Sequence, residues 1–223
     1  MGVAFDQAGS TGKTRLRAEF LLFYIGVPLV TAVFLPPSWM FPVLFAMTGG
    51  GLVLLAVTPG FHWRELAEGS NHVSWRLVLI VGLATAILGT VIIQWTAPQA
   101  FLFLIRTNPQ LMLMIALLYP ILSALPQEIV FRPLFFRRYG PILPAQRSRA
   151  ILLNSGIFSF AHLMYWSWIV AAMTFVGGLI FAKSYRVRGS FAEAVIAHSV
   201  AGVVIFALGL GVFFYSGNVT RPF

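Results

Sequence analysis

Long apolar stretches separated by short breaks make up most of this sequence, beginning with the run AEFLLFYIGVPLVTAVFL at residues 18–35. A run of this kind can cross a bilayer, since a spanning helix needs about 20 mostly apolar residues. Of the 223 residues, 59% are hydrophobic and 9% are charged, whereas a soluble globular domain has roughly 25% charged residues. The chain is therefore expected to fold as an all-α, polytopic membrane helix bundle.

Breaks rich in proline, glycine and polar residues divide the apolar stretches into about seven helices, within a range of six to eight. The expected spans are 18–37, 40–58, 75–96, 109–136, 150–164, 166–184 and 190–215. They form a single transmembrane domain over residues 18–215. We expect a cytoplasmic N-terminal tail at 1–17, loose over residues 1–12, and a C-terminal tail at 216–223.

The basic residues support this topology, because short cytoplasmic loops of membrane proteins carry most of the lysine and arginine. With the N-terminus in the cytoplasm, only Arg106 and Arg221 fall outside. The residues on the cytoplasmic side are Lys13, Arg15, Arg17, Arg64, Arg76, Arg137, Arg138, Arg147, Arg149, Lys183, Arg186 and Arg188. The net charge of +9 is thus explained by the lipid bilayer and requires no nucleic-acid partner. We expect a prokaryotic plasma membrane protein, with its C-terminus outside if the span count is odd.

A few polar side chains lie at membrane depth, where ionisable groups are costly and are functional candidates by default. Counted inward from the cytoplasmic helix ends at about 1.5 Å per residue, Glu128 lies about 13 Å deep, His162 about 18–20 Å and His198 about 12–15 Å. Glu193, about one turn inside, is expected to be interfacial. The full set is Gln127, Glu128, Arg132, His162, Glu193 and His198.

Spacing along the helices indicates which of these groups share a face. Glu128 and Arg132 are four residues apart, so the guanidinium can hold the carboxylate ionised and oriented. Gln127 points about 100° away from Glu128 and can address a neighbouring helix.

The two histidines complete a set of groups that can activate water. Phe158 and His162 share a face, as do His198 and Gly202. With a carboxylate and two imidazoles, one group can take a proton from water while another stabilises the oxyanion formed at a carbonyl carbon. The same groups could bind zinc, but a metal is not favoured and no cofactor is expected.

Each group also has a structural interpretation when taken alone. The Glu128–Arg132 pair can join two helices, and a single histidine on an apolar helix is more often part of the core than a catalyst. The convergence of three helices on one depth favours a site.

Three motifs carry a resemblance to a known family. They read QEIVFR at 127–132, FSFAH at 158–162 and HSVAG at 198–202. Their order and spacing, with the basic FFRRYG after the first, are similar to the CPBP superfamily. This superfamily comprises CAAX prenyl endopeptidases of type II and bacteriocin-processing or abortive-infection proteins, which are intramembrane proteases. The resemblance covers about residues 110–215.

The resemblance implies a role for each matching residue. In the family, the first Glu of a Glu-Glu pair and the histidine of the second motif activate the attacking water. Gln127 would occupy that general-base position, with His162 as its partner. His198 would donate to the oxyanion, and Glu128 and Arg132 would support the site.

Two positions depart from the family pattern. Gln127 is not a carboxylate and cannot accept a proton from water, and Gly202 stands where Asn or Asp is expected. Three explanations remain open: Glu128 takes over as the base with His162 after a small helix rotation, the chain is an inactive pseudoprotease, or Gln127 is an engineered change. The first is favoured.

The sequence therefore favours an intramembrane endopeptidase of the glutamate type that cleaves a membrane-associated peptide or protein near the cytoplasmic leaflet. The alternatives are a pseudoprotease scaffold that binds a membrane partner and, less favoured, a small proton-coupled or ion-coupled transporter. The substrate class within these limits is not specified by the sequence.

Overall fold

The computed structural model describes residues 10–219, 221 and 222, and within them every regular element is helical. The first helices are α1 (Ser10–Leu21), α2 (Val27–Val33), α3 (Met40–Ala56), α4 (Trp75–Thr96) and α5 (Phe103–Thr107). They are followed by α6 (Pro109–Tyr119), α7 (Leu125–Ile129), α8 (Arg147–Ala161), α9 (Trp168–Arg186), α10 (Phe191–Leu208) and α11 (Gly211–Phe214). The expected all-α class is confirmed.

Six segments of the described residues are long and apolar enough to cross a membrane, and the chain is a multi-pass membrane protein. They are Gly12–Val33, Pro37–Ala56, Trp75–Thr96, Pro109–Arg138, Trp168–Arg186 and Phe191–Leu208. The expected range of six to eight spans is thus met. The predicted span at 150–164 corresponds to α8, whose 15 residues are about 22 Å long, shorter than the ~30 Å hydrocarbon core. The location of the C-terminus depends on α8 and stays a prediction.

Two predicted boundaries differ from the structure. The helix expected at 190–215 ends at Leu208, because Gly209 adopts a left-handed conformation (φ +97°) and the Leu210 amide bonds back to the Ile205 carbonyl. A Cβ at Gly209 would overlap the backbone carbonyl of Ala100, so only glycine fits this end. At the other terminus, helix α1 begins at Ser10, inside the expected tail. The rest of the expected loose segment, residues 1–9, lies outside the described residues.

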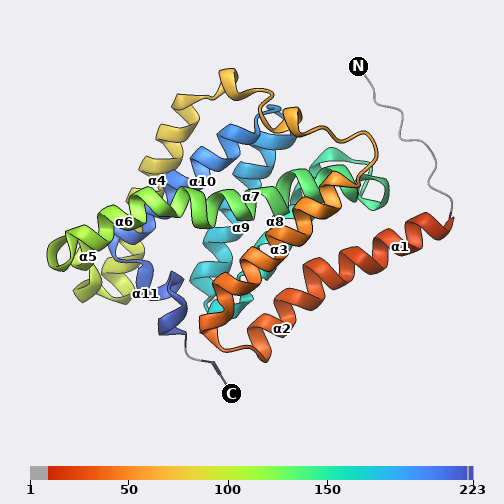
Figure 1. The fold of residues 1–223 in the computed structure, drawn as a ribbon. Coiled ribbons are helices and arrows are strands. Elements are labelled where there is room, and N and C mark those ends of the chain that lie inside the picture. Colours follow the sequence, from red (N-terminus) through yellow and green to blue (C-terminus); the bar gives the residue numbers. More distant parts are fainter. Residues whose placement is uncertain (1–9, 220, 223) are drawn as a thin grey trace.

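The span Pro109–Arg138 runs through the middle of the bundle (Figure 1), with α4 and α10 on one side and α1 to α3 on the other. Proline recurs along it at Pro120, Pro126 and Pro133, and each of these lacks the amide donor that an α-helix requires. Residues 120–124 and 130–138 form wider π-helical turns. Such turns change the direction of side chains relative to a regular helix, and they are frequent at functional sites.

Buried polar contacts fasten α1 and α2 to this span. Tyr24 is fully buried and donates to the backbone carbonyl of Val130 at 2.7 Å. Glu19 pairs with Arg138 through two hydrogen bonds and also accepts one from Tyr139 at 2.9 Å. These contacts close the bundle at the end of the central span.

Helices α8 and α9 form an antiparallel pair joined by a short turn, and α10 packs between α9 and α4. A Cβ at Gly178 in α9 would lie 3.1 Å from the Cα of Ser155 in α8, so this glycine allows close packing of the two backbones. The expected polar connection at 61–76 contains two short 3₁₀ turns, Trp63–Leu66 and Ser70–His72.

We predict that the Glu19–Arg138 pair is a main anchor of α1. Arg138 is buried, and removal of one partner from a buried pair costs about 3–5 kcal/mol because the other charge is left unpaired. Arg138→Met should therefore lower the free energy of unfolding by about this amount. The measurement is equilibrium unfolding of the protein in bicelles.

Arg137→Met is the matched control. The side chain of Arg137 is 29% exposed in its pair with Glu65, and such half-exposed pairs contribute only about 0–1 kcal/mol. Equal losses in the two variants would contradict the anchoring role of Arg138.

Candidate active site

A buried ion pair lies at the centre of the bundle. The guanidinium of Arg132 donates from Nε to Glu128 Oε2 at 2.7 Å and from Nη2 to Oε1 at 3.3 Å. Both side chains are fully buried. The contact follows the four-residue spacing, as the sequence predicted, and it neutralises two charges that would be very costly singly.

His198 of α10 joins this pair from across the bundle. Its Nδ1 lies 2.9 Å from Glu128 Oε1, and the ring stacks on Phe181 with 4.8 Å between the ring centres. An ionised carboxylate only accepts hydrogen bonds, so Nδ1 carries a proton and donates it. Both oxygens of Glu128 are thereby engaged, and Nε2 of His198 faces away from them.

Asn154 of α8 completes the support of Arg132, and sequence reasoning missed it. Its Oδ1 accepts a hydrogen bond from Arg132 Nη1, and its Nδ2 donates to the backbone carbonyl of Phe131 at 2.7 Å. The side chain is fully buried. The sequence does contain a signal for this role: an amide side chain within the apolar run ILLNSGIF is unusual and needs a polar partner in the membrane.

His162 lies at the C-terminal end of α8, opposite His198. Its Nδ1 lies 2.7 Å from the carbonyl oxygen of Phe158, which can only accept, so Nδ1 donates. The neutral ring then has an unprotonated Nε2, and none of the hydrogen bonds between described residues uses that atom. The fixed tautomer leaves a proton acceptor directed away from the backbone.

Gln127 presents its amide beside these rings. Nε2 donates to the hydroxyl of Ser123 at 2.9 Å, one helical turn earlier. The carbonyl oxygen Oε1 is buried and has no hydrogen-bond partner within the described part of the chain. A buried acceptor without a partner costs about 1–3 kcal/mol, so this oxygen is a ready contact for an incoming donor.

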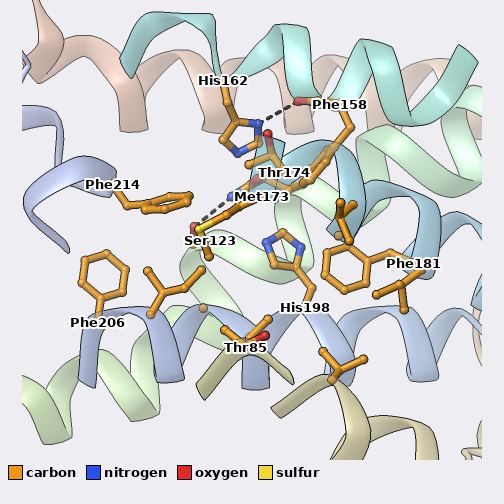
Figure 2. Close-up of a pocket in the computed structure, with 18 of the residues that line it drawn as sticks. Thr85, Ser123, Phe158, His162, Met173, Thr174, Phe181, His198, Phe206 and Phe214 are labelled. Carbon is orange, nitrogen blue, oxygen red and sulfur yellow. Dashed lines mark hydrogen bonds between the residues drawn. The ribbon is translucent and has the colours of Figure 1, made fainter. Parts of the chain in front are cut away.

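Both histidines point into one cavity of about 360 Å³ (Figure 2). Its lining is mostly apolar, and Gln127, Ser123 and Tyr119 add polar atoms to it. A smaller cavity of about 90 Å³ adjoins it and shares Gln127 and His162. An apolar cavity with a few convergent polar groups is typical of a ligand site.

The structure thus arranges the predicted residues in two layers. Gln127, His162 and His198 line the cavity, whereas Glu128 and Arg132 lie behind His198 and do not line it. The sequence paired Glu128 with His162 as an alternative base; the structure instead places its carboxylate against His198.

Two further polar residues of the lining, Tyr119 and Ser123, were also missed. The spacing of Tyr119, Ser123 and Gln127 at four-residue intervals would have placed all three on one helix face.

Glu193 lies apart from this site. It was expected to be interfacial; it sits in the first turn of α10 but is fully buried, bonded to Arg188 at 2.6 Å and to the backbone amide of Ser74 at 2.7 Å. These contacts attach the polar connection to α10.

The described residues contain no group of three or more His, Cys, Asp or Glu side chains arranged to hold a metal ion. The expectation that no metal is required stays a prediction.

The comparison with protein families agrees with the motifs. A family model described as type II CAAX prenyl endopeptidase Rce1-like matches residues 109–214. The resemblance to the CPBP superfamily is confirmed. The Rce1-like segment runs from α6 to the end of α11 and contains every residue of the site described above. No match was found among curated proteins or among solved structures.

We predict that Asn154 stabilises the site through Arg132. Asn154→Leu removes the acceptor of a buried charged donor, which costs about 1–3 kcal/mol or more. The unfolding free energy in bicelles should fall by at least that range. Ser155→Ala is the control, because its hydroxyl bonds only within its own helix, to Ile151. A loss no greater in Asn154→Leu than in Ser155→Ala would contradict this role.

Proposed function

We propose that this protein is an intramembrane endopeptidase that hydrolyses a peptide bond of a membrane-associated peptide or protein. One observation carries the proposal: His162 and His198 each have Nδ1 fixed by an internal acceptor, and both rings enter the same cavity. The fold and the family match agree with a CAAX-protease-like enzyme.

His162 is the proposed general base. Its tautomer leaves Nε2 unprotonated and directed to the cavity, where a water molecule can donate to it. The unpartnered oxygen of Gln127 can accept the second hydrogen of the same water. In this assignment Gln127 orients water rather than deprotonating it, so an amide at this position is compatible with catalysis.

His198 is proposed to act on the opposite side of the scissile bond. The carboxylate of Glu128 fixes its orientation and compensates the positive charge of an imidazolium, much as the aspartate does in a serine protease triad. Glu128 is then a positioning residue, and Arg132 holds it in place. The Glu128 carboxylate reaches the cavity only through His198.

The proposed reaction balances without a redox partner. The water oxygen forms a bond to the peptide carbonyl carbon, one water proton passes to His162, and the carbonyl oxygen becomes an oxyanion beside His198. Collapse of this intermediate breaks the C–N bond. The leaving nitrogen takes up the proton from His162, and the carboxylic acid and amine that result exchange one further proton, so that a carboxylate and an ammonium group are released.

The shape of the cavity supports a membrane-associated substrate. Ala84 and Leu88 of α4 and Ala172 and Val176 of α9 line the cavity and are exposed on the outer surface of the bundle. These residues belong to spanning helices, so their exposed faces meet lipid. An apolar substrate segment can therefore reach the histidines from the bilayer.

The location, orientation and cofactor requirement expected from the sequence belong to the same proposal. We propose that the enzyme works in a prokaryotic plasma membrane with its N-terminus in the cytoplasm, cleaves near the cytoplasmic leaflet, and needs neither a metal nor a nucleic-acid partner. Cleavage that continues at full rate in a chelator such as EDTA would support the absence of a required metal.

We predict that His162→Ala abolishes cleavage of a quenched-fluorescence peptide library by the protein in lipid vesicles. Loss of the base should lower kcat by about 10²–10⁴-fold. Glu128→Gln should lower kcat as well, because the amide cannot compensate an imidazolium. His72→Ala is the control, since His72 is exposed in the polar connection and is not part of the cavity lining.

Gln127→Glu separates the enzyme from a pseudoprotease. The amide of Gln127 can accept a hydrogen bond but cannot take up a proton as a carboxylate does. This observation favours an inactive scaffold. Cleavage by the unchanged chain that depends on His162 would support the enzyme. Cleavage seen only after Gln127→Glu would instead indicate a pseudoprotease, and full activity in His162→Ala would overturn the proposed mechanism.

A further inference from the structure

Tyr119 stands next to His198 at the cavity wall. It is the last residue of α6, and its hydroxyl lies 3.2 Å from Nε2 of His198. The two rings meet edge to face, with 6.1 Å between their centres. One turn later, Ser123 also lines the cavity and accepts a hydrogen bond from Gln127.

The ring of Tyr119 occupies the space above Gly202. A Cβ added to Gly202 would overlap the carbon atoms of that ring and its hydroxyl. Residue 202 lies one turn after His198 on the same face of α10, so its side chain would point at the same part of the cavity. The glycine and the tyrosine are therefore complementary: the absence of a side chain at 202 is what admits the phenol.

The local backbone explains the position of this phenol. Proline follows immediately at 120, and the π-helical turn Pro120–Ala124 begins there. The wider turn alters the phase of the helix at this point, and Tyr119, Ser123 and Gln127 all line the cavity.

We propose that the Tyr119 hydroxyl is a catalytic oxyanion donor, standing in for the side chain that Gly202 lacks. This inference rests on the proposed function. With the neutral ring, the phenol O–H donates to the unprotonated Nε2 of His198. Uptake of one proton from solvent before the reaction gives an imidazolium whose Nε2–H donates to the phenol oxygen, so that the phenol hydrogen is free to point at the developing oxyanion, and His198 is unchanged at the end of the cycle. Glu128, His198 and Tyr119 then form one chain of hydrogen bonds that ends at the substrate carbonyl oxygen.

The test compares Tyr119→Phe with the unchanged chain in lipid nanodiscs. The probe is a phosphinic peptide, a tetrahedral anion that imitates the intermediate, built on the library peptide that the chain binds best. Binding of the peptide with the same sequence and an ordinary amide bond is measured alongside. Loss of one oxyanion donor costs about 100- to 1,000-fold, so Tyr119→Phe should weaken phosphinate binding and lower kcat by about that factor. Affinity for the amide peptide and KM should change little.

Tyr185→Phe is the matched control. Tyr185 of α9 does not belong to the cavity lining, and its ring stacks on Phe136 with 5.9 Å between the ring centres. This variant should keep both the preference for the phosphinate and the value of kcat.

A side-chain swap tests the complementarity with Gly202. Gly202→Asn alone should impair binding and folding, since the new side chain overlaps the Tyr119 ring. Tyr119→Ala opens that space. The double variant Tyr119→Ala/Gly202→Asn should therefore prefer the phosphinate more strongly than the single variant Tyr119→Ala does. Such non-additivity is expected of residues in contact.

The outcomes separate this inference from the proposed function. Loss of the phosphinate preference in Tyr119→Phe but not in Tyr185→Phe supports the inference, even if the chain turns over no substrate. A preference that survives Tyr119→Phe overturns the inference and leaves the endopeptidase proposal standing. The absence of both cleavage and phosphinate preference in the unchanged chain overturns both.

Discussion

The buried charge of Glu128 is the constraint on which the rest of the site depends. In a bilayer, an isolated carboxylate would be too costly to keep ionised, so each of its oxygens needs a strong donor. Arg132 supplies one donor from the same helix and His198 supplies another from α10. Arg132 in turn needs Asn154 of α8 to satisfy its remaining hydrogens. One carboxylate therefore fixes the relative positions of three helices, and the orientation of the His198 ring follows from it.

The polar contacts of the site are arranged from the interior outward. The lining formed by the described residues contains no Asp, Glu, Lys or Arg, and its polar groups are two imidazoles, an amide, two phenols and three aliphatic hydroxyls. This arrangement suits a membrane enzyme, because a charge at the cavity wall would face lipid or an apolar substrate. It also bears on the replacement of the first glutamate of the family motif by Gln127. The second carboxylate of the pair, Glu128, is present, and in our proposal it acts through an imidazole.

The two departures from the family pattern are linked by structure rather than by sequence. Gln127 and Gly202 are far apart in the chain, and both contribute to the wall that contains Tyr119. Gly202 admits the phenol ring, and Ser123 of the same wall accepts a hydrogen bond from the Gln127 amide. A chain that loses an acid and an amide donor at these positions still has proton acceptors and donors at comparable places. This combination is the reason that we propose an active enzyme despite the two departures.

The sequence by itself determined the class of protein, most span boundaries to within a few residues, and the Glu128–Arg132 contact. All of these follow from local rules: the length needed to cross a bilayer and the 3.6-residue helical repeat. The tertiary structure decided which histidine the carboxylate contacts, that α8 is short, that α10 ends at Gly209, and that Asn154 and Tyr119 belong to the site. These facts depend on how helices rotate and pack against one another, and the π-helical turns of the central span shift that rotation in a way the regular repeat does not contain.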